Sequence, residues 1–301
     1  MYCKRKLLPA LILLVLPLLA RGEVRVFACE PEWAALAREV GGERVEVYSA
    51  TTAMQDPHRI QARPALIARL RRADLLICTG AQLESGWLPL LLRRARNPAV
   101  QPGRPGHLLI ADQMRLLERP ERLDRSRGDI HAAGNPHVHL DPRRIATAAR
   151  LLHQRLNRVD AASAGDYTRN LEHFLAGWEA AMADWNRRAA WLRGQRVVVH
   201  HRGWSYLLDW LGLTEAGVLE PLPGVPPSAT HLAALREHLA GEGVLAILRA
   251  TYQDARPSQW LSGQTGIPAV ALPFTVGGSE DAGDLRGLFE AILHRLEGLR
   301  R

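Results

Sequence analysis

Residues 167–192, YTRNLEHFLAGWEAAMADWNRRAAWL, decide how the rest of this 301-residue chain must be arranged. Their large apolar side chains recur at helical spacing, and the stretch contains one glycine and no proline, which predicts one long amphipathic helix. A helix of ~25 residues rises ~38 Å at 1.5 Å per residue. This length is enough to run along two lobes and to join them.

Strands alternate with helices on both sides of this stretch. The β-rich runs expected to form strands are 24–29, 45–50, 74–78, 108–111, 197–200, 244–248 and 268–272. The intervening helical patterns are 31–40, 64–73, 85–96, 141–159, 204–211 and 284–299. Such alternation is typical of parallel sheets wrapped in helices. We therefore predict an α/β fold with an N-terminal lobe at 23–160, a connecting helix at 161–192 and a C-terminal lobe at 193–301.

The first 22 residues have the composition of an export signal. Basic residues at 4–6 precede an uncharged apolar run at 7–19, and small residues at 20 and 22 place cleavage near Glu23. The run is shorter than the ~20 residues that span a bilayer comfortably, although a retained N-terminal anchor is the alternative. Cys3 precedes the apolar run, so it is not a lipoprotein attachment site. We expect a soluble periplasmic protein.

The net charge of the chain bears on whether it binds nucleic acid, and its length bears on the number of lobes. Removal of the signal takes away Lys4, Arg5, Lys6 and Arg21 and no acid, so the formal net charge falls from +8 to +4. The remaining basic residues are all arginines and are interleaved with acids along the chain, which predicts a solvated surface and no nucleic-acid partner. About 280 mature residues suggest two lobes, and we expect a monomer.

Two cysteines remain after processing. Cys29 and Cys78 each end an expected strand. An exported pair in an oxidising compartment can form a disulfide, whereas buried free thiols are also common core residues. The sequence does not tell whether the two strands are neighbours, so both readings stay open.

Three of the 12 histidines lie in short motifs at junctions between elements. His58 ends Asp-Pro-His at 56–58, His137 ends Asn-Pro-His at 135–137, and His201 lies in His-His-Arg-Gly-Trp-Ser-Tyr at 200–206. His58 and His201 follow the carboxyl ends of expected strands, where open α/β sheets place their ligands. Neutral imidazole is a common ligand of zinc. From the residues alone, the three either converge on a metal ion or are unrelated loop histidines.

The motifs resemble those of the metal-binding solute receptors of ABC importers, the zinc and manganese cluster of periplasmic binding proteins. Asp-Pro-His at 56–58, Gly80 with Glu84, and Asn-Pro-His followed by Asp-Pro at 141–142 match over essentially the whole mature chain. The family's third ligand precedes an aromatic residue at +3 and a tyrosine at +5, which selects His201 over His200. The resemblance implies a metal site between the lobes and delivery of the ion to an inner-membrane ABC permease, without enzymatic activity.

The third ligand type bears on which metal is carried. Manganese receptors of this family have glutamate at the position of His201 and two carboxylates in all. Three neutral nitrogens suit Zn²⁺, whereas an oxygen-rich set suits Mn²⁺. We therefore expect a high-affinity zinc receptor, with a manganese or iron receptor of the same architecture as the alternative. An exported zinc hydrolase is less favoured, although three histidines with an open fourth position also suit catalytic zinc. An adhesin or metal chaperone is a further alternative.

The fourth ligand departs from the family pattern. The family usually supplies an aspartate near 274–276, where this chain has Phe-Thr-Val. Glu280 or Asp281 could reach over from the following glycine turn, or water could complete the site. His131 is expected to be an ordinary surface residue, with transient metal collection as the alternative. His139 is expected to support or pack against the site and not to bind metal.

Overall fold

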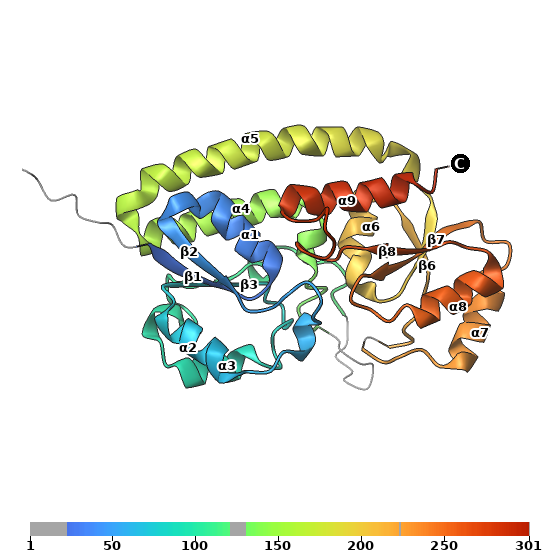
Figure 1. Ribbon diagram of the computed structural model, residues 1–301, viewed down its shortest axis with the longest axis horizontal. Coiled ribbons are helices and arrows are strands. Elements are labelled where there is room, and N and C mark those ends of the chain that lie inside the picture. Colours follow the sequence, from blue (N-terminus) through green and yellow to red (C-terminus); the bar gives the residue numbers. More distant parts are fainter. Residues whose placement is uncertain (1–22, 121–130, 223, 301) are drawn as a thin grey trace, which may run out of the picture.

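The N-terminal lobe is built on a parallel four-stranded sheet. The computed structural model describes residues 23–120, 131–222 and 224–300, and the expected signal peptide at 1–22 lies outside them (Figure 1). The strands β1 (Val24–Ala28), β2 (Val45–Ser49), β3 (Leu75–Cys78) and β4 (His107–Leu109) pair in the order β2-β1-β3-β4. All three pairings are parallel, as the alternation of strands and helices predicts.

The C-terminal lobe repeats this topology. Its strands β5 (Arg196–Val199), β6 (Thr214–Val218), β7 (Val244–Ala250) and β8 (Ala269–Leu272) pair in parallel in the order β6-β5-β7-β8. The first strand of each lobe therefore lies inside its sheet, next to the point at which the strand order reverses. The carboxyl ends of strands at such a point border a crevice that can hold a ligand. The predicted fold class is confirmed.

Helices cover both faces of each sheet (Figure 1). In the N-terminal lobe, α1 (Pro31–Gly41) and α4 (Pro142–Val159) share a core with Val26 and Ile77, whereas α2 (Pro64–Arg72) and α3 (Leu88–Ala95) cover Phe27 and Leu76. Successive strand residues thus face opposite layers, as the period of two in a strand requires. In the C-terminal lobe the helices are α6 (Ser205–Leu211) and α9 (Leu285–Glu297) on one face, and α7 (Ala229–His238) and α8 (Arg256–Thr265) on the other.

The long connecting helix α5 (Ala164–Arg188) runs along the top of both lobes in Figure 1. It starts three residues before the pattern at 167–192. It also ends earlier than the pattern predicts, because a short 3₁₀ turn, Ala190–Leu192, replaces its expected last turn. Its buried face includes Trp178 and Trp185, whose rings lie 5.6 and 5.2 Å from the Phe289 ring of α9.

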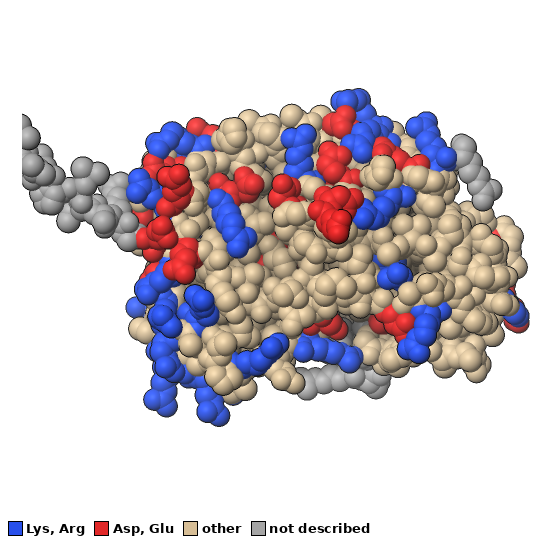
Figure 2. All heavy atoms as spheres, viewed as in Figure 1, with Lys and Arg blue, Asp and Glu red and all other residues tan. Residues whose placement is uncertain are grey.

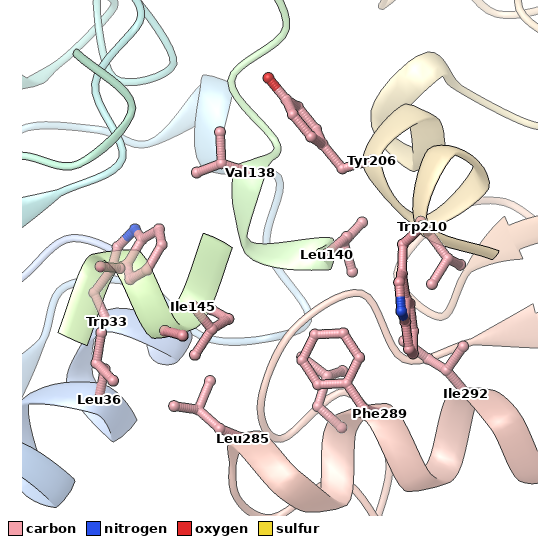
Figure 3. Packing of buried hydrophobic residues seen from close by; sticks show 14 of the residues in the cluster. Trp33, Leu36, Val138, Leu140, Ile145, Tyr206, Trp210, Leu285, Phe289 and Ile292 are labelled. Atoms are coloured by element: carbon pink, nitrogen blue, oxygen red, sulfur yellow. The ribbon is translucent and has the colours of Figure 1, made fainter. Parts of the chain in front are cut away.

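One hydrophobic core extends through both lobes. Figure 3 shows Trp33 and Ile145 of the N-terminal lobe in the same packed cluster as Trp210 and Phe289 of the C-terminal lobe. Separating the lobes widely would expose part of this core to water, at roughly 25 cal/mol for each Å² of apolar surface. The packing therefore favours small movements between the lobes.

Three elements of the C-terminal lobe are absent from the sequence expectations. They are β6, α7 and α8. The β6 sequence, TEAGV, contains a glycine and a glutamate and lies at the edge of the sheet, so it lacks the apolar run of a buried strand. Only Leu232 and Leu235 are buried on α7, and only Ser258 and Leu261 on α8. Such narrow apolar faces give a weak periodic signal.

The structure answers the open question about the cysteines. Strands β1 and β3 are neighbours, and the Cys29 N–H donates to the Ile77 carbonyl at 2.9 Å. The Cα atoms of Cys29 and Cys78 lie 4.8 Å apart and their sulfurs form a disulfide. The bond therefore ties the carboxyl ends of two central strands beside the crevice.

Surface charge is less evenly spread than the sequence analysis expects. Figure 2 shows basic side chains gathered at the lower left, over α2 and α3. Neither helix contains an acid, and the exposed basic residues on them are Arg69, Arg71, Arg72, Arg93 and Arg94. The two helices pack side by side, so their outward faces merge into one basic surface. No helix within the described ranges is long and apolar enough to cross a membrane.

Candidate metal centre

The structure brings the three motif histidines together between the lobes. The ring of His58 lies 5.7 Å from that of His137 and 6.1 Å from that of His201, and the last two are 5.8 Å apart. His58 belongs to a 3₁₀ turn after β2, His137 precedes a 3₁₀ turn before α4, and His201 follows β5. His137 is only 2% exposed. Residues separated by 79 and 64 positions in sequence thus share one crevice.

Two of the motifs hold their own histidine by a local hydrogen-bonded turn. The Asp56 side chain accepts from both the backbone N–H of His58, at 3.0 Å, and its ring Nδ1, at 2.8 Å. The Asn135 side chain does the same for His137, at 3.0 and 2.9 Å. Such turns are typical of Asp and Asn, whose short side chains reach the backbone two residues on. These contacts explain why each histidine follows an Asx-Pro pair.

The third histidine is held by a glutamate that the sequence analysis misses. The Glu220 carboxylate accepts from His201 Nδ1 at 2.8 Å and from the Gly224 N–H at 3.0 Å. Glu220 follows β6, the strand whose sequence signal is weak. In all three cases the Nδ1–H is donated, so Nε2 keeps its lone pair, which is the form that binds metal.

Electrostatics keep the buried His137 imidazole neutral and the carboxylates of Asp56 and Glu220 charged. Burial, together with the nearby His58 and His201, holds the pKa of His137 well below its usual value. Burial alone would raise the pKa of Asp56 and of Glu220, but the hydrogen bonds from His58 and His201 outweigh it and lower both. The His137 imidazole is therefore ready to accept a cation instead of a proton.

A fourth imidazole joins the three, against expectation. His131 is not an ordinary surface residue, because its Nε2 lies 3.2 Å from His58 Nε2 and its ring lies 6.4 Å from that of His137. Burial, followed by the nearby His58 and His201, lowers its pKa to about 4. The sequence carries no motif around His131, and its position depends on contacts with a distant turn.

The two acids considered for the fourth position lie elsewhere. The Asp281 carboxylate accepts from both terminal nitrogens of Arg295, at 2.9 and 3.0 Å, and Glu280 is exposed to solvent. The place of the expected aspartate is taken by Phe274, whose ring packs edge-on against His137 at 5.4 Å. Among the described residues, no hydrogen bond or ion pair joins either acid to a histidine of the site, so the fourth ligand stays open. Arg295 binds Asp281 from the adjacent helix and holds it away.

His139 supports the wall of the site. Its Nε2 lies 2.9 Å from the Phe274 carbonyl, and its ring lies 5.2 Å from the Phe274 ring. Its Nδ1 is 3.4 Å from a carboxylate oxygen of Glu32, which also accepts from the Thr275 hydroxyl. His139 therefore links the N-terminal lobe to the Phe274 segment of the C-terminal lobe, as expected of a residue beside the site.

A solvent-accessible cavity of about 350 Å³ leads to the histidines. Its wall includes His58, His201, Glu220 and Tyr252. A larger cavity, of about 1130 Å³, lies at the other end of the C-terminal lobe and has no histidine or cysteine in its wall. Nitrogen ligands thus line only the smaller of these two cavities.

The donor atoms of the histidines are close but not yet gathered around one point. Across the described part of the chain, only Cys29, Cys78 and Glu84 have donor atoms that all lie within 4.8 Å of one another. The two cysteines are bonded to each other, so they offer no thiolate. The histidine nitrogens would have to approach further to share an ion.

Two parallel-sheet lobes that meet at a histidine-lined crevice beneath one long helix define a substrate-binding protein of metal ABC transporters. The chain belongs to the family described as zinc-uptake complex component A, periplasmic, whose profile matches residues 26–299. Members of this family are solute receptors and not enzymes, so the hydrolase alternative is wrong.

Individual relatives agree with this assignment and differ in the metal they are named for. The high-affinity zinc uptake system protein ZnuA of Paracoccus denitrificans is 27% identical over 273 residues, which cover 79% of each chain. The manganese ABC transporter substrate-binding lipoprotein PsaA of Streptococcus pneumoniae is 19% identical over 258 residues, covering 84% of this chain and 80% of its own. A crystal structure of ZnuA superposes with a TM-score of 0.75 at 19% identity, covering 93% of this chain and all of that one, and it shows the shared fold.

Proposed function

We propose that this protein is a high-affinity periplasmic receptor for Zn²⁺ that passes its ion to an ABC permease, and that His58, His137 and His201 bind the ion. The observation that carries the proposal is the convergence of these three imidazoles from both lobes, each with Nδ1 donated to a partner and Nε2 free. Zinc accepts neutral imidazole nitrogens in tetrahedral sites.

The ligand set supports zinc over manganese. Asp56 and Glu220 each accept a hydrogen bond from the Nδ1 of a ring, and Phe274 brings a hydrocarbon ring where a carboxylate is expected. Mn²⁺ prefers carboxylate, carbonyl and water oxygens, whereas imidazole suits zinc. The pneumococcal relative named for manganese keeps a metal receptor for Mn²⁺ or iron as the second candidate.

The division of ligands between the lobes suggests how the ion is bound and released. His58 and His137 come from the proposed N-terminal lobe (23–160), and His201 comes from the proposed C-terminal lobe (193–301). A small closure would gather the nitrogens around the ion, and a small opening at the permease would release it. The shared core and α5 limit both movements. Export by the segment at 1–22 and action as a monomer complete the proposal.

Metal analysis of the purified protein tests the ligand assignment. We expect one equivalent of zinc in the wild type and its loss in His58→Ala, His137→Ala and His201→Ala. His238→Ala, at an exposed position near the end of α7, serves as the matched control and should keep its zinc. Retention of zinc in any one of the three variants would remove that residue from the site, and no zinc in the wild type would overturn the proposal.

A further inference from the structure

We propose that His131 is the fourth ligand and that this all-nitrogen set selects Zn²⁺ over Mn²⁺. The inference rests on the proposed function, because it completes the same site. The sequence has no carboxylate at the family's fourth position, and Asp281, a candidate to replace it, pairs with Arg295. His131 has its Nε2 3.2 Å from that of His58 and its ring 6.4 Å from that of His137.

The distance between His131 and His58 already matches two ligands of one ion. Tetrahedral zinc with Zn–N bonds of ~2.0–2.1 Å places neighbouring nitrogens ~3.3 Å apart. The two Nε2 atoms lie 3.2 Å apart. His58 donates its Nδ1–H to Asp56, so its Nε2 presents a lone pair toward His131. An ion shared by both nitrogens would satisfy this arrangement.

A turn in the N-terminal lobe holds His131 in place. The Ala132 N–H donates to the Gln82 side-chain oxygen at 2.6 Å. The residue that follows His131 is therefore tied to the turn that carries Gln82.

This turn has an uncommon backbone that other side chains stabilise. Gly80, Ala81 and Gln82 have φ values of 81°, 48° and 72°, and positive φ is unfavourable for residues with a Cβ. The Gly80 N–H donates to Glu84 at 3.0 Å, and the Ala81 N–H donates to Asp112 at 2.7 Å. Strained backbone that its surroundings maintain is typical of functional sites. Here it presents the atoms that position His131.

The charges of the completed site would balance. Four neutral imidazoles around Zn²⁺ leave a net charge of +2, and the carboxylates of Asp56 and Glu220, bonded to the far sides of two rings, supply −2. Buried charge is tolerated when it is paired in this way. Four nitrogens also disfavour Mn²⁺, which prefers oxygen ligands. His131 would therefore determine the choice of metal as well as its affinity.

The test compares His131→Ala and His131→Asp with the wild type and with His238→Ala. Zinc and manganese affinities are measured by competition with a chelator of known affinity, and X-ray absorption of the zinc form counts the imidazoles. We expect four imidazoles in the wild type and three in His131→Ala, with one zinc still bound. In His131→Ala the zinc dissociation constant should rise by on the order of 100-fold. Residues that only hydrogen-bond to metal ligands already contribute up to about 100-fold, so a direct ligand should contribute at least as much. His131→Asp should bind Mn²⁺ more tightly than the wild type does.

The outcomes separate this inference from the proposed function. Three imidazoles in the wild type, with unchanged zinc affinity in His131→Ala, would overturn the role of His131 and leave the three-histidine receptor intact. Failure of the wild type to bind zinc would overturn both. Two variants test the positioning role of the turn. Gln82→Ala should weaken zinc binding, but less than His131→Ala does. Gln82→Glu keeps the acceptor oxygen and should therefore bind zinc about as tightly as the wild type.

Discussion

Two clusters of buried and half-buried polar side chains meet at the crevice, and they use their polar atoms in opposite ways. The imidazole cluster consists of His58, His131, His137 and His201, and the carboxylate cluster consists of Glu30, Glu32 and Glu84. Both reach the region around Phe274, where Glu30, Glu32 and His137 line a common cavity of about 20 Å³.

The imidazole cluster leaves donor atoms free, whereas the carboxylates of the other cluster accept hydrogen bonds within the protein, except for one buried oxygen of Glu30. Glu84 accepts from the Thr79 and Gly80 backbone, and Glu30 accepts from Thr79. Glu32 accepts from Thr275 in the other lobe. By contrast, three of the histidines donate through Nδ1, and the Nε2 of one of them, His58, lies 3.2 Å from the Nε2 of His131. Free lone pairs that converge indicate a binding site, and mutually satisfied groups indicate a structural one.

The largest expected effect is the loss of metal binding in the imidazole cluster. One of four ligands contributes roughly a quarter of the ~10–16 kcal/mol typical of structural zinc, so His137→Ala should weaken zinc binding by about 100- to 1000-fold. Glu32→Gln, in the other cluster, should bind zinc nearly as well as the wild type. Isothermal titration with a chelator measures both, and equal losses in the two variants would contradict the division of roles.

The next largest effect concerns the stability of the region that carries the carboxylate cluster. The disulfide between Cys29 and Cys78 closes a loop of 49 residues next to Glu30 and Thr79. Replacing both cysteines with serine should lower the free energy of unfolding by about 2–4 kcal/mol. Urea unfolding measures this loss, and zinc affinity should change far less than in His137→Ala. A folded variant that binds no zinc would show that the clusters are coupled.

The two clusters should shift stability with pH in opposite directions. The pKa of His131 falls from 6.5 to about 4 on folding, so the unfolded chain takes up the proton first as pH drops. The metal-free protein should therefore lose stability between about pH 6.5 and pH 4, by at most roughly 3 kcal/mol from this residue. His137 adds a change of the same sign.

For the carboxylates the sign is reversed. Burial raises the pKa of Glu84 to about 7, and burial with the nearby Glu84 raises that of Glu30. Their protonated forms stabilise the fold at low pH, and this contribution is lost as pH rises from about 4.5 to 7. Urea unfolding across pH should show a smaller loss below pH 6.5 in His131→Ala and a smaller loss above pH 4.5 in Glu30→Gln. Identical pH profiles in both variants would contradict the assignment.

The smallest expected effect comes from the partners that orient the rings. Glu220→Gln removes the charge that fixes the Nδ1–H of His201. Outer partners of this kind contribute about 10- to 100-fold in metal affinity, so the change should be smaller than in His137→Ala. Glu215→Gln is the matched control, because Glu215 binds Arg202 at the surface of the same strand region. Equal zinc affinity in Glu220→Gln and wild type would remove this role.

The sequence analysis was correct for features that depend on residues close together in the chain. The alternation of strands and helices predicted both sheets, and the Asx-Pro-His motifs located His58 and His137 because each turn is closed by the side chain two residues earlier. The resemblance to metal receptors selected His201 from a pair of adjacent histidines. In each case the information lies within a few residues of the site.

Long-range contacts account for what the sequence did not predict. The His131 segment is held at the site through Gln82, some 50 residues away, and Glu220 follows an edge strand with little apolar character. Asp281 was a candidate ligand on proximity in sequence, but Arg295 of the last helix binds it. Contacts of this kind depend on how elements distant in sequence pack together, so neither periodicity nor a local motif predicts them.

A metal competition experiment tests the central claim most directly. The metal-free protein is mixed with equal concentrations of Zn²⁺, Mn²⁺ and Fe²⁺ under anaerobic conditions, and the bound metals are measured after gel filtration. The histidine ligands predict one zinc per chain and almost no manganese or iron. Manganese or iron bound at one equivalent, with zinc excluded, would contradict the assignment of this protein as a zinc receptor.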